Sequence, residues 1–120
     1  MKLIEEYYKN GFDYLDEDDE MEIVKFIQEN AKKAPVLYRG INIDEELEID
    51  DELFLQGDHM FCSMSPNEND AWAFGDAVLV VEGLSGIEVE YCDYEWIVED
   101  QKVYVDRIEE KDGVTYYYCS

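Results

Sequence analysis

The amino-acid sequence predicts one α+β domain, in which N-terminal helices precede short, mostly antiparallel strands. Apolar residues recur at helical spacing mainly in the first third of the 120-residue chain, and short apolar runs separated by turn residues follow. An Asp-Gly pair at 112–113 marks a hairpin near the C-terminus. Neither a repeat nor a linker divides the sequence, so we expect residues 1–120 to share one core of modest size.

Two helices are expected before residue 35. Residues 2–9 predict a short helix that Gly11 breaks, with a buried face made of Leu3, Ile4 and either Tyr7 or Tyr8. Residues 20–33 predict a clearer helix, because four apolar residues recur there at helical spacing: Ile23, Phe26, Ile27 and Ala31. Lys32 and Lys33 suit its C-terminal end, where the helix dipole favours cations.

The acidic run at residues 13–20 separates these helices. We expect a solvated connector whose carboxylates favour the N-terminus of the second helix. A metal site is the alternative interpretation, although the run lacks the spacing and the mid-loop glycine of a calcium loop.

Short strands are expected after Pro35. Residues 36–40 form the first, which we expect in the centre of a sheet, and residues 42–58 form an acidic connection with room for one helical turn. The other expected strands span residues 59–64, 77–82, 87–89, 95–98, 102–109 and 114–118.

The strand at 59–64 is expected to turn directly into a helix at 66–74. Ser65 suits the N-cap, Pro66 the first helical position, and Glu68 completes a capping box. This junction would hold Ser63 at the mouth of a strand. Ser65 is expected to be mainly a cap.

The net charge of −23 comes from 32 acidic and nine basic residues, and neither Lys nor Arg occurs between Arg39 and Lys102. Such a chain lacks the clustered cations that bind phosphates, so direct binding to nucleic acid or to an anionic membrane is not expected. The charge favours encounter with a basic partner. The alternative is that it serves only solubility.

Three widely spaced cysteines and one histidine, His59, predict neither a zinc site nor a disulfide framework. Cys62 is expected in the core. No apolar run is long enough to span a membrane, and the N-terminus lacks the apolar segment of a signal peptide. We therefore expect a reduced, cytoplasmic location. Oligomeric state is not predicted.

Three segments carry polar residues at predicted strand ends: Arg39 and Gly40 after Leu37-Tyr38, Ser63 and Ser65 around Met64, and Glu95 before an apolar run. In this order they resemble the arginine–serine–glutamate class of mono-ADP-ribosyltransferases, which includes bacterial toxins and phage enzymes that modify host proteins. The likeness covers residues 36–118. It implies the fold of that class of enzymes and NAD as cofactor. A small acidic member of the class suits a phage, whose protein would act in the host cytoplasm.

The resemblance also implies roles for individual residues. Glu95 and Ser63 are the catalytic residues, and Asp93 lies where many members carry a Glu or Gln that positions the acceptor. NAD would be bound by Arg39, Gly40, Tyr38, Ser65 and Phe74. No metal is implied. Asp93 is shorter than the usual Glu, so an arginine acceptor does not follow.

Each of these residues also has a purely structural interpretation: Arg39 as the partner of nearby carboxylates, Ser63 as the partner of a backbone group, and Glu95 as a surface acid. At the level of the protein, the alternative is a catalytically inactive, acidic binding module of the same fold. Such a module would mask a basic nucleic-acid-binding protein, as a DNA mimic does. An immunity-type protein that neutralises a basic toxin is a third possibility, which only the net charge supports.

Overall fold

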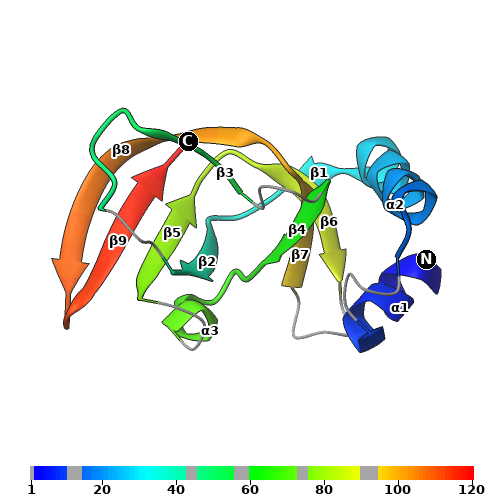
Figure 1. Cartoon of the computed structure of the whole chain (residues 1–120), viewed down its shortest axis with the longest axis horizontal. Coiled ribbons are helices and arrows are strands. Elements are labelled where there is room, and N and C mark those ends of the chain that lie inside the picture. The colour runs from blue at the N-terminus through cyan, green and yellow to red at the C-terminus, as the bar shows by residue number, and fades with distance from the viewer. Residues whose placement is uncertain (1, 11–14, 43–45, 56–59, 73–75, 90–94) are drawn as a thin grey trace.

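The computed structural model describes residues 2–10, 15–42, 46–55, 60–72, 76–89 and 95–120, and these form a mixed α+β fold with mostly β structure. Two sheets lie side by side, with two helices at one end of the molecule (Figure 1). This arrangement confirms an α+β class in which two N-terminal helices precede mostly antiparallel strands.

The four-stranded sheet is entirely antiparallel and has the order β1-β6-β7-β4. Its strands are β1 (Lys32–Lys33), β6 (Ser85–Val89), β7 (Glu95–Glu99) and β4 (Phe61–Met64). Helices α1 (Lys2–Asn10) and α2 (Glu17–Asn30) cover one face, where an apolar cluster joins them to the sheet. The buried members of this cluster are Ile4, Ile23, Ile27, Phe61, Val89 and Ile97.

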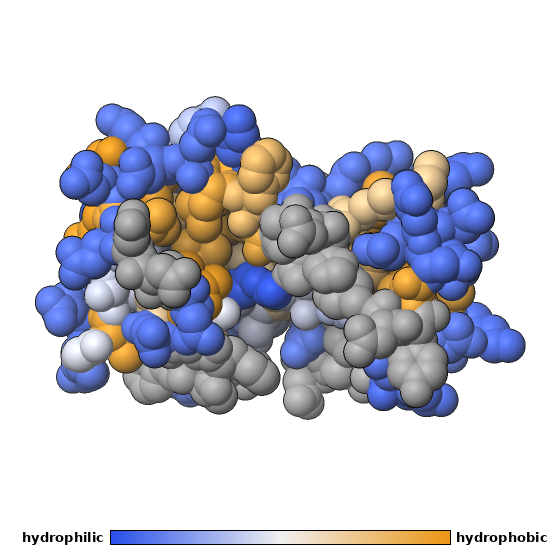
Figure 2. Space-filling view, in the orientation of Figure 1, coloured by the Kyte–Doolittle hydropathy of each residue, from blue (hydrophilic) through white to orange (hydrophobic). Residues whose placement is uncertain are grey.

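The five-stranded sheet has the order β2-β5-β9-β8-β3, in which only β5 and β9 run parallel. Its strands are β2 (Leu37–Ile41), β5 (Ala77–Val81), β9 (Val114–Cys119), β8 (Lys102–Lys111) and β3 (Glu52–Phe54). The short helix α3 (Glu68–Trp72) contributes Ala71 to an apolar cluster with Val78, Val80 and Tyr116. Figure 2 shows apolar side chains gathered over the five-stranded sheet and framed by hydrophilic ones.

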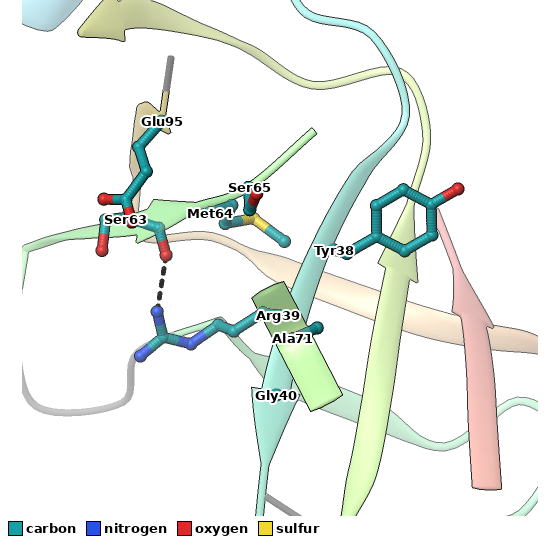
Figure 3. Close-up of a pocket in the computed structure, with 8 residues that line it drawn as sticks. All are labelled: Tyr38, Arg39, Gly40, Ser63, Met64, Ser65, Ala71 and Glu95. Atoms are coloured by element: carbon teal, nitrogen blue, oxygen red, sulfur yellow. Dashed lines mark hydrogen bonds between the residues drawn. The ribbon is translucent and has the colours of Figure 1, made fainter. Parts of the chain in front are cut away.

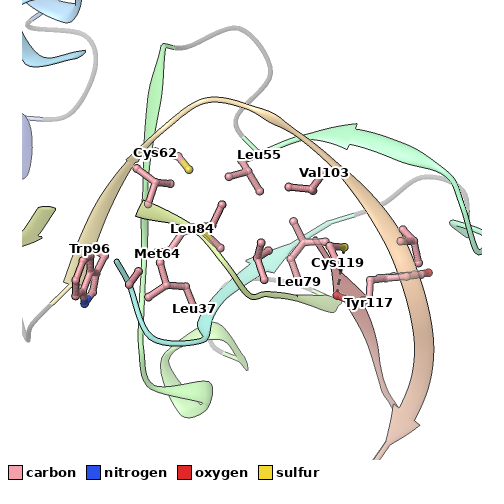
Figure 4. Close-up of a cluster of buried hydrophobic side chains, with 14 of the residues drawn as sticks. Leu37, Leu55, Cys62, Met64, Leu79, Leu84, Trp96, Val103, Tyr117 and Cys119 are labelled. Carbon is pink, nitrogen blue, oxygen red and sulfur yellow. Dashed lines mark hydrogen bonds between the residues drawn. The ribbon is translucent and has the colours of Figure 1, made fainter. Parts of the chain in front are cut away.

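The main core lies between the two sheets (Figure 4). Alternation along each strand builds it, because successive side chains point to opposite faces of a sheet. On β4, Cys62 and Met64 join this core, whereas Phe61 faces the helices. Cys62 is fully buried, as predicted, and its burial raises the pKa of the thiol to about 12.

Several predicted boundaries were wrong. Helix α2 begins at Glu17, not residue 20, because Asp16 and Asp19 form a reciprocal capping box. Lys32 and Lys33 do not end that helix; they form β1, and the Lys32 ammonium lies 5.7 Å from the centre of the Trp96 ring. In the connection at 42–58, the described residues 52–54 form strand β3, which was not predicted.

Strand β2 lies at an edge of its sheet, so the predicted central position was wrong. The sequence of β2 is as apolar as that of a central strand because the end of β4 covers its outer side, through a bridge between Tyr38 and Ser65. By contrast, the hairpin at Asp112-Gly113 is confirmed. Both residues have positive φ, 53° and 81°, as a tight hairpin turn requires.

Candidate functional site

A pocket of about 320 Å³ lies where the edges of the two sheets meet. Strand β4 ends one sheet and β2 ends the other, and the Tyr38 and Ser65 backbones join them with N–H···O distances of 2.7 and 3.0 Å. The residues that line the pocket are Tyr38, Arg39, Gly40, Ser63, Met64, Ser65, Ala71 and Glu95 (Figure 3). The backbone pairing therefore fixes the spacing of the pocket walls.

Arg39 reaches across this junction from β2 to β4. Its Nη1 donates to the carbonyl oxygen of Ser63 at 2.6 Å, as the dashed line in Figure 3 shows. A bond from a charged donor is stronger than a neutral one, and it holds the planar guanidinium in one orientation beside the pocket. Arg39 lies within β2, not at its end as predicted.

Ser63 and Glu95 lie on one face of the four-stranded sheet. Strands β4 and β7 pair Ser63 with Ile97 and Met64 with Trp96, and continuing this register sets Ser65 level with Glu95. Since side chains two residues apart share a face, the Ser63 hydroxyl and the Glu95 carboxylate are diagonal neighbours. Glu95 begins β7, as predicted.

Ser65 has a local structural role, and its prediction as the helix N-cap was wrong. Its Oγ accepts from the backbone N–H of Asn67 at 3.0 Å, which closes a turn. Helix α3 then begins at Glu68, and the Asn67 side chain accepts from the N–H of Asn69 at 3.0 Å. The turn takes up the two residues that follow Ser65, so the helix begins later than predicted and Asn67 is its capping residue.

Tyr38 lines the pocket, but its ring points away from Arg39, Ser63 and Glu95 (Figure 3). The ring packs against the apolar cluster on the outer face of the five-stranded sheet. Tyr38 therefore contributes to the site through its backbone, which is hydrogen-bonded to that of Ser65. Gly40 also lines the pocket. The predicted site residues Asp93 and Phe74 lie outside the described residues.

The structure adds residues that the sequence did not single out for the site. Met64 and Ala71 also line the pocket. Tyr7 of α1 packs against β4, where its ring meets the Phe61 ring edge-on with centroids 5.1 Å apart, and burial raises the pKa of its phenol. The helical pattern indicated a buried position for Tyr7 or Tyr8, but nothing local in the sequence connects residue 7 with β4.

Among the described residues that line the pocket, Arg39 supplies a cation and Glu95 a carboxylate. Arg107, the other arginine, lies elsewhere: its guanidinium stacks 4.1 Å from the Tyr118 ring and its Nε lies 3.3 Å from Glu109. Arg39 is thus the cation that can meet an anionic ligand there. The high pKa of Cys62 keeps that thiol neutral, so it is not a nucleophile for this pocket.

Within the described part of the chain, no three His, Cys, Asp or Glu side chains are grouped so that they could hold a metal ion. Among the same residues, none of the helices has the length and apolar character needed to cross a membrane.

Comparison with known proteins finds no family model that matches this chain and no significant match among curated proteins.

Proposed function

We propose that this protein is an NAD-dependent mono-ADP-ribosyltransferase that modifies a basic host protein. The observation that carries the proposal is the convergence of Arg39, Ser63 and Glu95, from three strands, on one pocket. These residues were singled out from the sequence alone, where 24 and 32 positions separate them. A chance set of surface residues has no reason to meet at one cavity.

Arg39 supplies the anchor for the dinucleotide. A guanidinium presents a fork of donors that matches a pyrophosphate or a ribose hydroxyl pair. One of its donors holds the Ser63 carbonyl, so the fork is oriented before the ligand arrives. The surrounding negative charge opposes NAD binding, which makes this single guanidinium decisive for affinity.

The pocket size suits part of NAD. A volume of about 320 Å³ is at the lower end of ligand pockets and fits the nicotinamide and its ribose, while the adenosine end would extend outward. Gly40 forms a wall without a side chain, which allows a planar amide to approach the backbone.

Glu95 would act on the ribose. When the bond between ribose C1′ and the nicotinamide nitrogen breaks, its electron pair leaves with nicotinamide and positive charge develops on the ribose. A fixed carboxylate stabilises that charge and accepts a hydrogen bond from the 2′-hydroxyl. The acceptor nucleophile then bonds to C1′ and releases its proton. Ser63, on the same face, orients the carboxylate.

The net charge of −23 favours a basic acceptor and also a second candidate function. A chain with this charge can mask a basic nucleic-acid-binding protein without any catalysis. The two functions differ in one respect that can be measured: masking does not consume NAD.

The test uses NAD labelled on its adenylate, a bacterial lysate, and three proteins: wild type, Glu95→Gln and Glu99→Gln. Glu99 is the matched control, since it lies on the same strand but bonds Gln28 of α2 at 2.9 Å, away from the pocket. We expect wild type and Glu99→Gln to label a protein in the lysate, and Glu95→Gln to lose at least about a hundred-fold in rate.

If wild type neither transfers label nor releases nicotinamide, the transferase proposal fails. Salt-sensitive retention of a basic protein by wild type and both variants would then support the second candidate function, masking of a basic nucleic-acid-binding protein.

A further inference from the structure

An open groove runs along helix α2 beside the residue that precedes β4. Its volume is about 700 Å³, more than twice that of the pocket where the sheets meet. Met21 and Val24 line it from the helix, and Met60 lines it from the start of β4. The pocket residues Ser63 and Ser65 lie at the other end of that strand. Among the described residues the two cavities share no lining residue, so they are separate sites.

The groove follows one side of α2, which lies at the end of the molecule away from β8 and β9 (Figure 1). Met21, Val24 and Gln28 are spaced by three and four residues, so they lie along one stripe of the helix. With Glu17 at the other end, the stripe is about 16 Å long at a rise of about 1.5 Å per residue. The groove is therefore as long as about three turns of a partner helix.

Two hydrogen bonds hold the walls of the groove in place. Gln28 Nε2 donates to Glu99 Oε1 at 2.9 Å, which ties the C-terminal half of α2 to β7. The backbone N–H of Asp100 donates to the Met60 carbonyl at 2.8 Å, which fixes Met60 beside the end of β7. Because the walls are formed before a partner arrives, binding costs less ordering of the protein.

The lining combines apolar and acidic side chains. Met21 is 54% exposed, and methionine adapts its shape to the side chains of a partner. The exposed carboxylates of Glu17 and Glu22 line the same groove, and Lys25 is the single basic residue of α2. The groove therefore offers an apolar contact surface with negative charge beside it.

This combination selects the occupant by charge. A second copy of this chain would bring two molecules of net charge −23 together, and an anionic membrane would be repelled as well. A helix with apolar residues on one side and cations beside them gains from both parts of the lining. Its apolar residues, three and four apart, would match the spacing of the stripe on α2.

We propose that this groove docks a basic amphipathic helix of the partner protein. The apolar residues of that helix contact Met21, Val24 and Met60, and its cations lie beside Glu17 and Glu22. The inference rests on the proposed function only in taking the partner to be the basic protein that is modified or masked. Docking itself needs neither NAD nor catalysis.

The test uses synthetic peptides of about three helical turns as probes. The first carries leucines on one side of the helix and lysines on the other. The second has the same residues in an order that spreads the leucines around the helix, and the third replaces every lysine by glutamate. By fluorescence anisotropy, we expect wild type to bind the first peptide at least about ten-fold more tightly than either of the others. Equal binding of the first two would overturn the proposal, because charge alone would then explain the affinity.

Met21→Gln locates the apolar contact. It removes an apolar side chain from the exposed surface of a helix and replaces it with a good helix former, so folding should be retained. Ile49→Gln is the matched control, since Ile49 is 58% exposed and does not line the groove. We expect Met21→Gln to raise the Kd of the first peptide about ten-fold, and Ile49→Gln to change it less than about two-fold. Equal effects of the two variants would place the peptide elsewhere.

The acidic contact is tested by a pair of double variants with the same change in net charge. Glu17→Gln with Glu22→Gln alters the groove, whereas Glu46→Gln with Glu110→Gln alters exposed positions outside its lining. At low salt, the first double variant should raise the Kd of the lysine peptide about five-fold, and the second less than about two-fold. If both raise it alike, the whole field of the protein and not the groove attracts the peptide.

Methionine methyl groups labelled with ¹³C give a direct readout of the binding place. Their NMR signals are assigned with single methionine-to-leucine variants. The first peptide should shift the signals of Met21 and Met60 and leave that of Met64, which lies in the core and lines the pocket, unchanged. A shift of Met64 without the other two would place the peptide at the pocket and overturn the proposal.

These outcomes are distinct from those that test the transferase. If the first peptide binds the groove as expected but wild type does not turn over NAD, the transferase proposal fails and the docking groove stands. If wild type transfers ADP-ribose but does not prefer the amphipathic basic peptide, the docking proposal fails and the transferase stands. Equal melting temperatures for wild type and Met21→Gln exclude unfolding as the cause of weaker binding.

Discussion

Tyr38 and Ser65 exchange two backbone hydrogen bonds, and this pair joins an edge of one sheet to an edge of the other. The N–H of Tyr38 donates to the Ser65 carbonyl at 2.7 Å, and the N–H of Ser65 donates to the Tyr38 carbonyl at 3.0 Å. Arg39 and Ser63 lie one and two residues from the pair along their strands, and Glu95 is level with Ser65 in the register. The site therefore depends on this bridge.

Ser65→Pro should damage the site through the backbone. Proline lacks the N–H that bonds Tyr38, which leaves the Tyr38 carbonyl without that donor and lowers the free energy of unfolding by about 1–3 kcal/mol. Ser65→Ala keeps the bridge and removes the turn bond to the Asn67 N–H, so its cost should be smaller, on the order of 1 kcal/mol. Urea unfolding measures both variants. Equal losses of unfolding free energy in the two variants would show that the backbone bridge does not contribute measurably to stability.

Arg39→Lys should weaken NAD binding while it preserves charge. Lysine cannot present the planar fork, and we expect the Kd for NAD, measured by calorimetry, to rise about ten- to a hundred-fold. Arg107→Lys is the matched control, since Arg107 stacks on Tyr118 outside the pocket. The role assigned to Arg39 is wrong if the two variants bind NAD alike.

Gly86→Ala should destabilise the sheet that carries Glu95. A Cβ at Gly86 would clash with the Ile97 carbonyl oxygen and lie 2.8 Å from Val98 Cγ1, both on the neighbouring strand β7. Such overpacking typically costs about 1–3 kcal/mol. At Gly83, where φ is +81° and no atom lies within 4 Å of the added Cβ, only backbone strain of about 1–2 kcal/mol applies. Thermal unfolding of Gly86→Ala should therefore show a lower melting temperature than wild type, and an unchanged melting temperature would contradict the clash.

Stability should fall in alkaline solution because of Cys62. Burial raises the pKa of its thiol from 9.0 to about 12, so above pH 9 the unfolded chain has lost a proton that the folded chain retains. This contribution is fully present below pH 9 and is lost as the pH rises toward 12. Between pH 8 and pH 10, wild type should lose about 1 kcal/mol more of its unfolding free energy than Cys62→Val. Parallel pH profiles for the two proteins would contradict the assignment.

Local patterns predicted the elements whose causes are local. The Asp112-Gly113 hairpin follows from residues that tolerate positive φ, and the apolar run at 77–81 forms β5. The start of α2 was missed because an Asp–Asp capping box replaces the more usual residues. The start of α3 was missed because Ser65 closes a turn before the helix begins.

The sequence by itself determined the fold class, the charge and the three residue types that meet at the candidate site. Tertiary structure decided that Arg39, Ser63 and Glu95 share a pocket, that β2 lies at a sheet edge, and that the Tyr7 ring packs on Phe61. The physical reason is the range of the interactions. Helix caps and turns depend on neighbours within a few residues, whereas the junction of two sheets depends on the packing of segments that are far apart along the chain.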